Sequence, residues 1–344
     1  MSSAKESALD AKIAAMRSRL LKTEDYLALA SCQSVTELAA KLKGYSNYSY
    51  VLEGFDPSST RRGFLERRLS LTVPEDFKSI YRFVGDFRLR GYLDAFFLKD
   101  EIDTLKFILN SVCDQRETDY TPTEISTLLA NETSRIDVSK LLKSKSIPEF
   151  LENLKGAEFY PVLAKKYQNE TPTLFELKFE LDLYYFLHLD SLAKKFLDKQ
   201  NRKAMQYIIG SDADLKNIMW TYRLHKFHGM YGNALFPFLI PLRHRLKKSA
   251  LIKMVECKTI PELESEIANS PYAATFADKT ILEKKYYEAA LTVFRRARLL
   301  YNSAISHATA YIFLKELEIK NITSITEGVR YKLNPQKIMS YVVI

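Results

Sequence analysis

The strongest hydrophobic pattern in the chain lies near its C-terminal end. Apolar residues recur there at intervals of three and four positions, or sums of these, which is the spacing of one helix face. They are Ile305, Ala308, Ile312, Ile319, Ile322, Val329 and Leu333. The positions off this face include Glu316, Glu318, Lys320 and Arg330. The pattern therefore predicts a long amphipathic helix in this part of the chain.

This predicted helix has room to extend over Thr280–Leu333, where Asn334–Pro335 ends it. At about 1.5 Å per residue it would be roughly 80 Å long. A compact chain of 344 residues has a radius of gyration of about 20 Å, so a straight helix of that length would exceed its diameter. We therefore expect a bend or break within Thr323–Thr326 or at Gly328.

Two earlier stretches repeat the centre of this pattern. An apolar residue, a lysine, a variable residue and an isoleucine occur at Leu105–Ile108, Leu215–Ile218 and Ile319–Ile322. Two acidic residues precede each copy: Glu101 and Asp103, Asp212 and Asp214, and Glu316 and Glu318. A block that recurs in this way indicates one helical unit used three times.

A second recurring feature marks the start of a helix. Ser34–Glu37, Ser146–Glu149 and Thr259–Glu262 each place a hydroxyl residue three positions before a glutamate, with steps of 112 and 113 residues between copies. In such a capping box, the hydroxyl accepts a hydrogen bond from the glutamate N–H, and the carboxylate accepts one from the N–H of the hydroxyl residue. A tyrosine follows each copy: Tyr48, Tyr160 and Tyr272. We predict three pseudo-repeated helical units, which we call repeats 1 to 3, at residues 1–115, 116–230 and 231–344.

The rest of the chain also has helical signals. Residues 9–31 carry apolar positions at helical spacing, and further capping boxes occur at Thr173–Glu176 and Thr280–Glu283. Alternation typical of a strand occurs only in residues 340–344. The chain has ten Gly and eleven Pro, which is few for its length and favours long helices. The predicted fold class is all-α.

The apolar segments of the sequence bear on the location of the protein in the cell. The longest apolar run, Ala234–Pro241, is too short to span a bilayer and contains two prolines. The first residues lack the apolar core of a signal peptide. We therefore expect a cytosolic protein, or one attached to a membrane only through partners. The three cysteines are far apart in sequence, and we expect them to be small buried residues.

The charge of the chain is unevenly distributed. The net charge is +9, and each predicted repeat has 17 Lys and Arg. The acidic residues number 16, 16 and 10, so the excess is +1, +1 and +7. The basic residues of repeat 3 cluster at Arg243, Arg245, Lys247 and Lys248 and at Arg295, Arg296 and Arg298. Such clusters suit an anionic partner, although a solvated face without a partner explains either cluster equally well.

No pattern of catalytic residues is present in the sequence. It has no Gly-rich phosphate loop of the Walker type and no Gly-x-Ser-x-Gly nucleophile turn. His225 and His228 have a spacing that places both imidazoles on one helix face, but no carboxylate or cysteine nearby completes a metal site. Acidic pairs such as Glu316 and Glu318 point to different sides of a helix. The sequence therefore predicts a protein that is not an enzyme and that holds no cofactor or metal.

Three segments resemble a known protein family. They are Met16–Leu27, Leu314–Ile322 and Glu327–Tyr331. Together with the three-repeat plan, they resemble the central-stalk subunit of vacuolar/archaeal-type rotary ATPases, called C in prokaryotes and d in eukaryotes. The resemblance covers essentially the whole chain and is most specific at its two ends.

This resemblance implies an all-helical, funnel-like body with pseudo-threefold symmetry around a central opening. It implies a non-catalytic, peripheral subunit at the cytoplasmic face of a membrane, in a complex that translocates protons or sodium ions. Its partners would be the axle subunits D and F and the membrane rotor ring, and it would transmit torque between ATP turnover and ion transport. The alternative is a helical scaffold or nucleic-acid-binding protein with a basic surface, which predicts salt-sensitive RNA or DNA binding.

The resemblance supplies no catalytic residues and no cofactor. The positions that match its C-terminal motif are Glu316, Glu318, Asn321, Glu327 and Arg330. We expect these residues to form helix-surface ion pairs and hydrogen bonds within repeat 3. We expect the basic clusters to form part of a surface that faces the membrane sector.

Overall fold

Helices make up most of the part of the chain that the structure describes. This computed structural model describes residues 2–54, 63–114, 136–169, 172–278 and 281–344. These ranges form α-helices and two short 3-10 helices, Gly232–Ala234 and Phe236–Phe238, and contain no β-strand. The prediction of an all-α fold is confirmed. The chain divides into two compact units, a larger one of Met1–Gly85 with Asp198–Ile344 and a smaller one of Asp86–Leu197.

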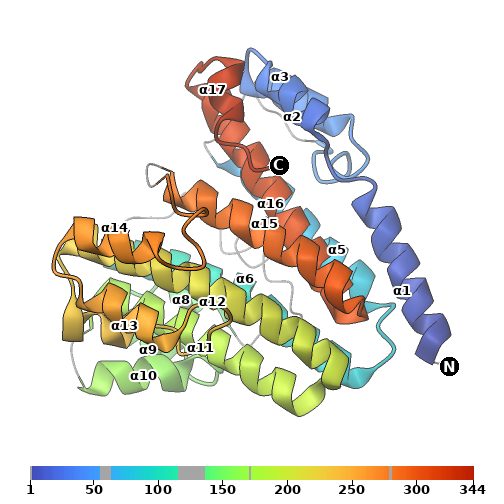
Figure 1. Cartoon of the computed structure of the whole chain (residues 1–344). Helices are drawn as coiled ribbons and strands as arrows, with labels where there is room; N and C mark the ends of the chain where they lie inside the picture. The colour runs from blue at the N-terminus through green and yellow to red at the C-terminus, as the bar shows by residue number, and fades with distance from the viewer. Residues whose placement is uncertain (1, 55–62, 115–135, 170–171, 279–280) are drawn as a thin grey trace. The chain divides into compact units, whose positions relative to one another are not determined.

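The smaller unit is built on two long helices that pack against each other. Its helices are α6 (Phe87–Asp114), α8 (Val138–Leu142), α9 (Ile147–Asn153), α10 (Tyr160–Asn169) and α11 (Leu174–Phe196). α6 packs on α11, and the short helices α8 and α9 pack on α6 (Figure 1). The contact between α6 and α11 includes an ion pair, in which Lys106 Nζ lies 2.5 Å from Asp182 Oδ1.

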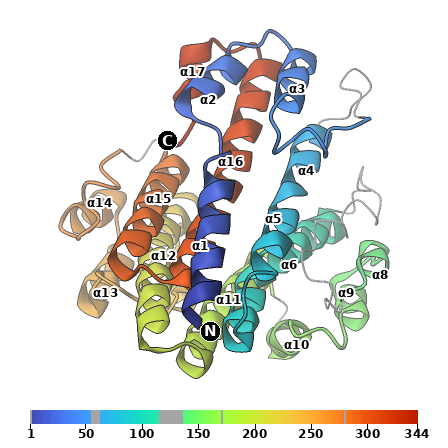
Figure 2. The ribbon, with the colours of Figure 1, turned by 90° about the vertical axis from the view of Figure 1, so that its right-hand side faces the viewer.

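The larger unit is organised around α16. Its helices are α1 (Ser2–Arg17), α2 (Thr23–Ala30), α3 (Val35–Lys43), α4 (Phe64–Ser70), α5 (Thr72–Tyr81), α12 (Lys199–His228), α13 (Lys248–Glu256), α14 (Ile260–Ala268), α15 (Leu282–Tyr301), α16 (Ala304–Arg330) and α17 (Pro335–Met339). Helices from both ends of the sequence, including α1, α2, α5, α15 and α17, pack on α16 (Figure 2). Because neighbours cover it on several sides, α16 has buried residues around most of its circumference.

Two predicted helices are each interrupted. The C-terminal helix breaks between α15 and α16, where Asn302 is left-handed (φ 40°) and Ser303 caps α16 by accepting a hydrogen bond from Ser306 N. The prediction of a bend or break at Thr323–Thr326 or Gly328 is wrong as to a break, because α16 continues through these residues. The predicted helix at residues 9–31 is two helices, α1 and α2, with residues 18–22 between them.

The three predicted capping boxes begin three short helices in similar settings. Each box opens the second helix of a short pair, and the pairs α2–α3, α8–α9 and α13–α14 pack on the long helices α16, α6 and α12. The hydroxyls of Ser34, Ser146 and Thr259 accept from the glutamate N–H groups at 3.1, 3.4 and 3.4 Å.

One detail of these boxes differs from the prediction. Each glutamate carboxylate accepts from the backbone N–H of the residue before the hydroxyl residue, at 2.8, 2.8 and 2.9 Å. In all three boxes the carboxylate therefore binds the N–H of the residue just before the helix cap, and not the N–H of the hydroxyl residue itself. The box at Thr173–Glu176 has the predicted form, with Thr173 N donating to Glu176 Oε2 at 2.7 Å. The box at Thr280–Glu283 includes a residue outside the described ranges.

The tyrosines that follow the boxes have different environments. Tyr48 and Tyr272 are buried, whereas Tyr160 is half-buried and its neighbour Phe159 is the buried aromatic residue. The repeat boundaries at 1–115, 116–230 and 231–344, and the funnel with a central opening, stay predictions.

Candidate functional site

The predicted basic clusters lie in the larger unit, one on the loop before α13 and the first residue of that helix, the other on α15. We call them together the basic surface: Arg243, Arg245, Lys247, Lys248, Arg295, Arg296 and Arg298. All are exposed except Arg298, which is half-buried. Burial, together with the nearby charge of Arg17, lowers the pKa of the Arg298 guanidinium. The surface therefore concentrates positive charge on two neighbouring segments of one unit.

Tyr207 of α12 connects the two halves of the basic surface. Its ring contacts the rings of His244 and Tyr301, with centroids 4.8 and 5.7 Å apart. Burial raises the pKa of Tyr207, while the charges of Arg296 and Arg245 act in the opposite direction. Residues from the loop and from the end of α15 therefore meet around the Tyr207 ring.

A buried carboxylate holds the loop that carries Arg243 and Arg245. Asp214 of α12 is fully buried and accepts hydrogen bonds from the backbone N–H groups of His244, Arg245 and Leu246, at 3.2, 2.7 and 2.9 Å. Several N–H donors to one carboxylate offset the cost of burying its charge. The loop backbone is thus fixed on α12, while its basic side chains stay exposed.

Two further contacts complete this arrangement, which we call the α12 joint. The hydroxyl of Tyr272 donates to Asp214 Oδ2 at 2.8 Å, and burial followed by the charge of Asp214 raises the pKa of this tyrosine. Asn217 uses its amide on both backbone groups of Ile240, donating to the carbonyl at 2.9 Å and accepting from the N–H at 2.8 Å.

A corresponding arrangement lies on α16, and we call it the α16 joint. Glu318, 2% exposed, accepts hydrogen bonds from the backbone N–H of Leu21 and from the hydroxyl of Tyr48. Lys315, fully buried, donates to Glu318 Oε1 at 3.0 Å and to the Tyr48 hydroxyl at 3.0 Å, and its Nζ lies 4.1 Å from the centroid of the Tyr48 ring. Burial, and then the charge of Glu318, raises the pKa of Tyr48 well above its ordinary value.

The motif residues on α16 are not confined to the helix surface. Glu318 and Asn321 are buried, and the partners of Glu318 at Leu21 and Tyr48 come from residues 1–115. The expectation of helix-surface contacts is therefore wrong for both residues, because both are buried, and the expectation of contacts within repeat 3 is wrong for Glu318, because the N-terminal segments cover its side of α16. Asn321 pairs with both backbone groups of Val343, at 2.8 and 2.9 Å.

The other motif residues lie nearer the surface. Arg330 forms an ion pair with Glu327, and its Nη2 lies 3.7 Å from Glu66 Oε1 of α4. Glu316 is half-buried. These contacts join the end of α16 to α4, which is a structural role.

The sequence did contain a signal for the two joints. When the stretches Leu215–Ile218 and Ile319–Ile322 are aligned, Asp214 corresponds to Glu318 and Asn217 corresponds to Asn321. What the sequence pattern did not indicate is Lys315, since a lysine on a helix normally lies at the surface.

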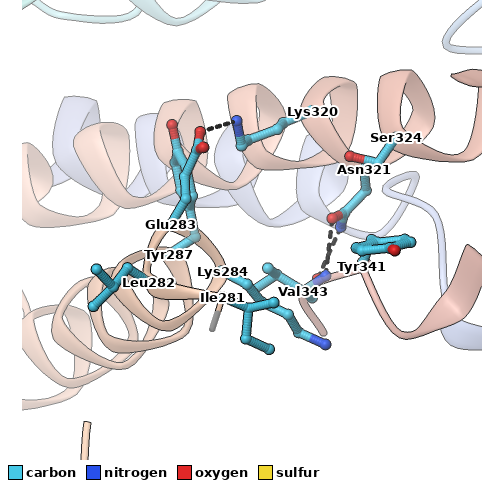
Figure 3. A pocket seen from close by; sticks show the side chains of 10 residues that line it. All are labelled: Ile281, Leu282, Glu283, Lys284, Tyr287, Lys320, Asn321, Ser324, Tyr341 and Val343. Atoms are coloured by element: carbon cyan, nitrogen blue, oxygen red, sulfur yellow. Dashed lines mark hydrogen bonds and ion pairs between the residues drawn. The ribbon is translucent and has the colours of Figure 1, made fainter. Parts of the chain in front are cut away.

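A cleft of about 330 Å³ lies between α15, α16 and the C-terminal tail (Figure 3). Its lining is Ile281, Leu282, Glu283, Lys284, Tyr287, Lys320, Asn321, Ser324, Tyr341 and Val343. Lys320 pairs with Glu283 at 2.8 Å and lies 4.6 Å from the Tyr287 ring centroid, and Lys284 donates to the Ser340 carbonyl at 2.7 Å. Both lysines of the lining are therefore engaged in contacts with neighbouring residues, and the lining includes no histidine or cysteine.

The paired histidines do not form a metal site. His225 Nε2 lies 3.1 Å from the Cys257 carbonyl oxygen, and within the described ranges no group of His, Cys, Asp and Glu is arranged to hold a metal ion. Among the helices that the structure describes, none has the length and apolar character needed to cross a membrane.

Comparison with known proteins places the chain in a class. The family model for the ATP synthase (C/AC39) subunit matches residues 9–341. The chain therefore belongs to this family of ATP synthase subunits.

Individual relatives are similar over almost their whole length. The C subunit of the A-type ATP synthase from Methanosarcina barkeri is 24% identical over 345 residues, covering 97% of this chain and 91% of the relative. The proteins of the same name from Methanosphaera stadtmanae and Pyrococcus abyssi are each 23% identical, covering 93% and 97% of this chain and 83% and 89% of the relatives. The family resemblance inferred from the two ends of the sequence is thus confirmed.

Proposed function

We propose that this chain is a non-catalytic central-stalk subunit of a vacuolar/archaeal-type rotary ATP synthase or ATPase. In this role it links the axle subunits D and F to the membrane rotor ring and transmits torque between ATP turnover and ion transport. It works at the cytoplasmic face of the membrane and contacts the membrane only through the complex. The observation that carries the proposal is the family match over residues 9–341.

The architecture of the chain suits this role. A torque-transmitting part must be stiff, and the three longest helices, α6, α12 and α16, have 28, 30 and 27 residues. The buried polar contacts of the α12 and α16 joints fix short helices and loops on two of them. Such contacts favour a rigid larger unit over a set of independently moving helices.

The first test concerns catalysis and coupling. The purified chain should not hydrolyse ATP, because its sequence has no phosphate-binding loop. Added to a reconstituted complex that lacks this component, it should restore the coupling between ATP hydrolysis and ion movement. Nucleotide turnover by the isolated chain that a point substitution in this chain abolishes would contradict the proposal.

The second test concerns the basic surface, which we propose faces the rotor ring. The variant R243E/R245E/K247E should fold and bind the axle pair, but it should associate with solubilised ring more slowly than wild type. Charges at the rim of an interface mainly affect the rate of association. At physiological ionic strength the Debye length is about 8 Å, so added salt weakens the attraction between these charges and their partner. Added salt should therefore slow association of the wild type and have little slowing effect on the variant.

A matched control has the same change of charge in the smaller unit. The variant K140E/K143E/K145E alters three exposed lysines, one in α8 and two between α8 and α9, and should associate with the ring like wild type. If the two variants behave alike at every ionic strength, or if the first loses only axle binding, the basic surface does not face the ring. Salt-sensitive RNA binding by the wild type that competes with the ring would favour the nucleic-acid-binding alternative.

A further inference from the structure

The α12 and α16 joints share one layout on two helices of the larger unit. Asp214 and Asn217 on α12 correspond to Glu318 and Asn321 on α16, and in each pair the amide residue follows the carboxylate residue by three positions. Each carboxylate accepts from a tyrosine hydroxyl and from backbone just before a short helix, and each amide pairs with both backbone groups of one residue. The two joints can therefore be compared contact by contact.

The path of the chain differs between the two joints. At the α12 joint, Ile240 and His244–Leu246 belong to one continuous loop. At the α16 joint, Val343 comes from the C-terminal tail, whereas Leu21 comes from the segment between α1 and α2. No peptide connection joins these two segments at the joint. We call the contact of residues 9–54 with α16 the seam (Figure 2).

The donors to the buried carboxylate differ accordingly. Asp214 accepts from three consecutive backbone N–H groups of its loop. At Glu318, within the described residues, Leu21 supplies one backbone N–H, and the ammonium group of Lys315 supplies a further donor. The position on α12 that corresponds to Lys315 holds Ser211, which is also buried.

We propose that Lys315 is the positioning residue that stabilises this seam, that is, the packing of the N-terminal helices on α16. Its ammonium group takes the place of the backbone N–H donors that a continuous loop gives Asp214, and it places a positive charge against the buried carboxylate of Glu318. Glu318 then holds the backbone of Leu21, and with it the N-terminal helices, on α16. This role goes beyond the proposed function and does not depend on it.

The proposal has a consequence for local stability. At the α16 joint, Glu318 holds the segment before α2 through a single backbone N–H, that of Leu21, whereas at the α12 joint three backbone N–H groups and Asn217 hold the loop before α13. A segment held by fewer contacts opens locally without the rest of the unit unfolding. Loss of the contact between Lys315 and Glu318 should therefore release α2 and α3 from α16 selectively.

The test is hydrogen exchange measured by mass spectrometry on the full chain. In Lys315→Met, Glu318 is left buried without its cation, so the amides of α2 and α3 should exchange on the order of 100- to 1000-fold faster than in wild type. Exchange in α13 and α14 should stay within a few-fold of wild type. The matched variant Ser211→Ala, at the corresponding position of α12, should leave exchange in all four helices unchanged.

A second variant makes the result independent of whether Lys315→Met folds. In K315M/E318Q neither charge is buried, so this variant should fold and exchange in α2 and α3 within about tenfold of wild type. The proposal is overturned if α2–α3 and α13–α14 accelerate equally in Lys315→Met, or if α2 and α3 do not accelerate. It is also overturned if K315M/E318Q fails to fold or opens the seam as much as Lys315→Met does.

Discussion

Two glycines inside long helices should respond in opposite ways to the same substitution. Gly91 lies in α6 and Gly210 in α12. At Gly91 a Cβ atom would lie 4.0 Å from Phe196 Cε2, an ordinary van der Waals contact. At Gly210 it would lie 2.8 Å from the carbonyl oxygen and 3.0 Å from the carbonyl carbon of Arg243, which is backbone of the loop that carries the basic surface.

The expected magnitudes follow from these distances. Replacing Gly by Ala in a helix interior stabilises by about 0.5–1 kcal/mol when space is available, so Gly91→Ala should raise the free energy of unfolding by that amount. Forcing an extra methyl group into a filled site costs about 1–3 kcal/mol. The Arg243 backbone has little freedom to move away, because the next residues donate to Asp214. Gly210→Ala should therefore lower the free energy of unfolding by about 1–2 kcal/mol in net.

The single tryptophan provides the assay for the larger unit. Trp220 is the only tryptophan in the sequence and lies in α12, so its fluorescence during urea unfolding reports on the larger unit. Gly210→Ala should move the Trp220 transition to lower urea. Gly91→Ala should leave that transition in place and slow hydrogen exchange in α6.

One result would refute this reasoning. If Gly210→Ala is as stable as wild type or more stable, helix propensity outweighs the close approach of the loop to α12. The loop would then have room to move away from Gly210 without losing its bonds to Asp214.

Three further substitutions test separate parts of the structure. Gly328→Ala should destabilise the larger unit by about 1–3 kcal/mol, because its Cβ would lie 2.6 Å from Ile338 Cγ1 of α17; adding Ile338→Ala should reduce the effect of the alanine at 328, as measured in a double-mutant cycle by urea unfolding. The backbone hydrogen bond from Thr173 lowers the pKa of Glu176 below its ordinary value of 4.5. The advantage of wild type over Glu176→Gln should thus be present above that value and disappear as the pH falls through the lowered pKa; a difference that persists at lower pH would contradict this assignment. Burial raises the pKa of Asp76 above 3.8 even though it accepts a hydrogen bond from Tyr311. Relative to Asp76→Asn, which does not titrate, wild type should lose stability as the pH rises from 3.8 through the raised pKa, and the urea midpoints of the two proteins should show a constant difference above it.

The sequence by itself determined the features that depend on neighbouring residues. The helical spacing of apolar positions and the scarcity of Gly and Pro predicted an all-α chain, because helix formation depends on interactions between residues that are close together in the sequence. The hydroxyl caps at Ser34, Ser146 and Thr259 were located correctly for the same reason. Segments at the two ends were sufficient to indicate the family.

The sequence determined less about helix ends. The break between α15 and α16 depends on a left-handed Asn302 and the cap at Ser303, which are single-residue signals within a long apolar pattern. At Gly328 the sequence signal was misleading, since this glycine permits the close approach of Ile338 and does not end the helix. A glycine that permits close packing and a glycine that permits a turn cannot be distinguished from the sequence.

Only the tertiary structure decided the role of the charged residues on α16. The periodic pattern places Glu318 off the apolar face, which is normally the solvent side, and the same pattern gives no reason to bury Lys315. Both are buried because segments from the other end of the chain, with Leu21 and Tyr48, pack over that side of α16. Burial of a charge is set by what covers it and by which donors surround it, and those neighbours lie far away along the chain.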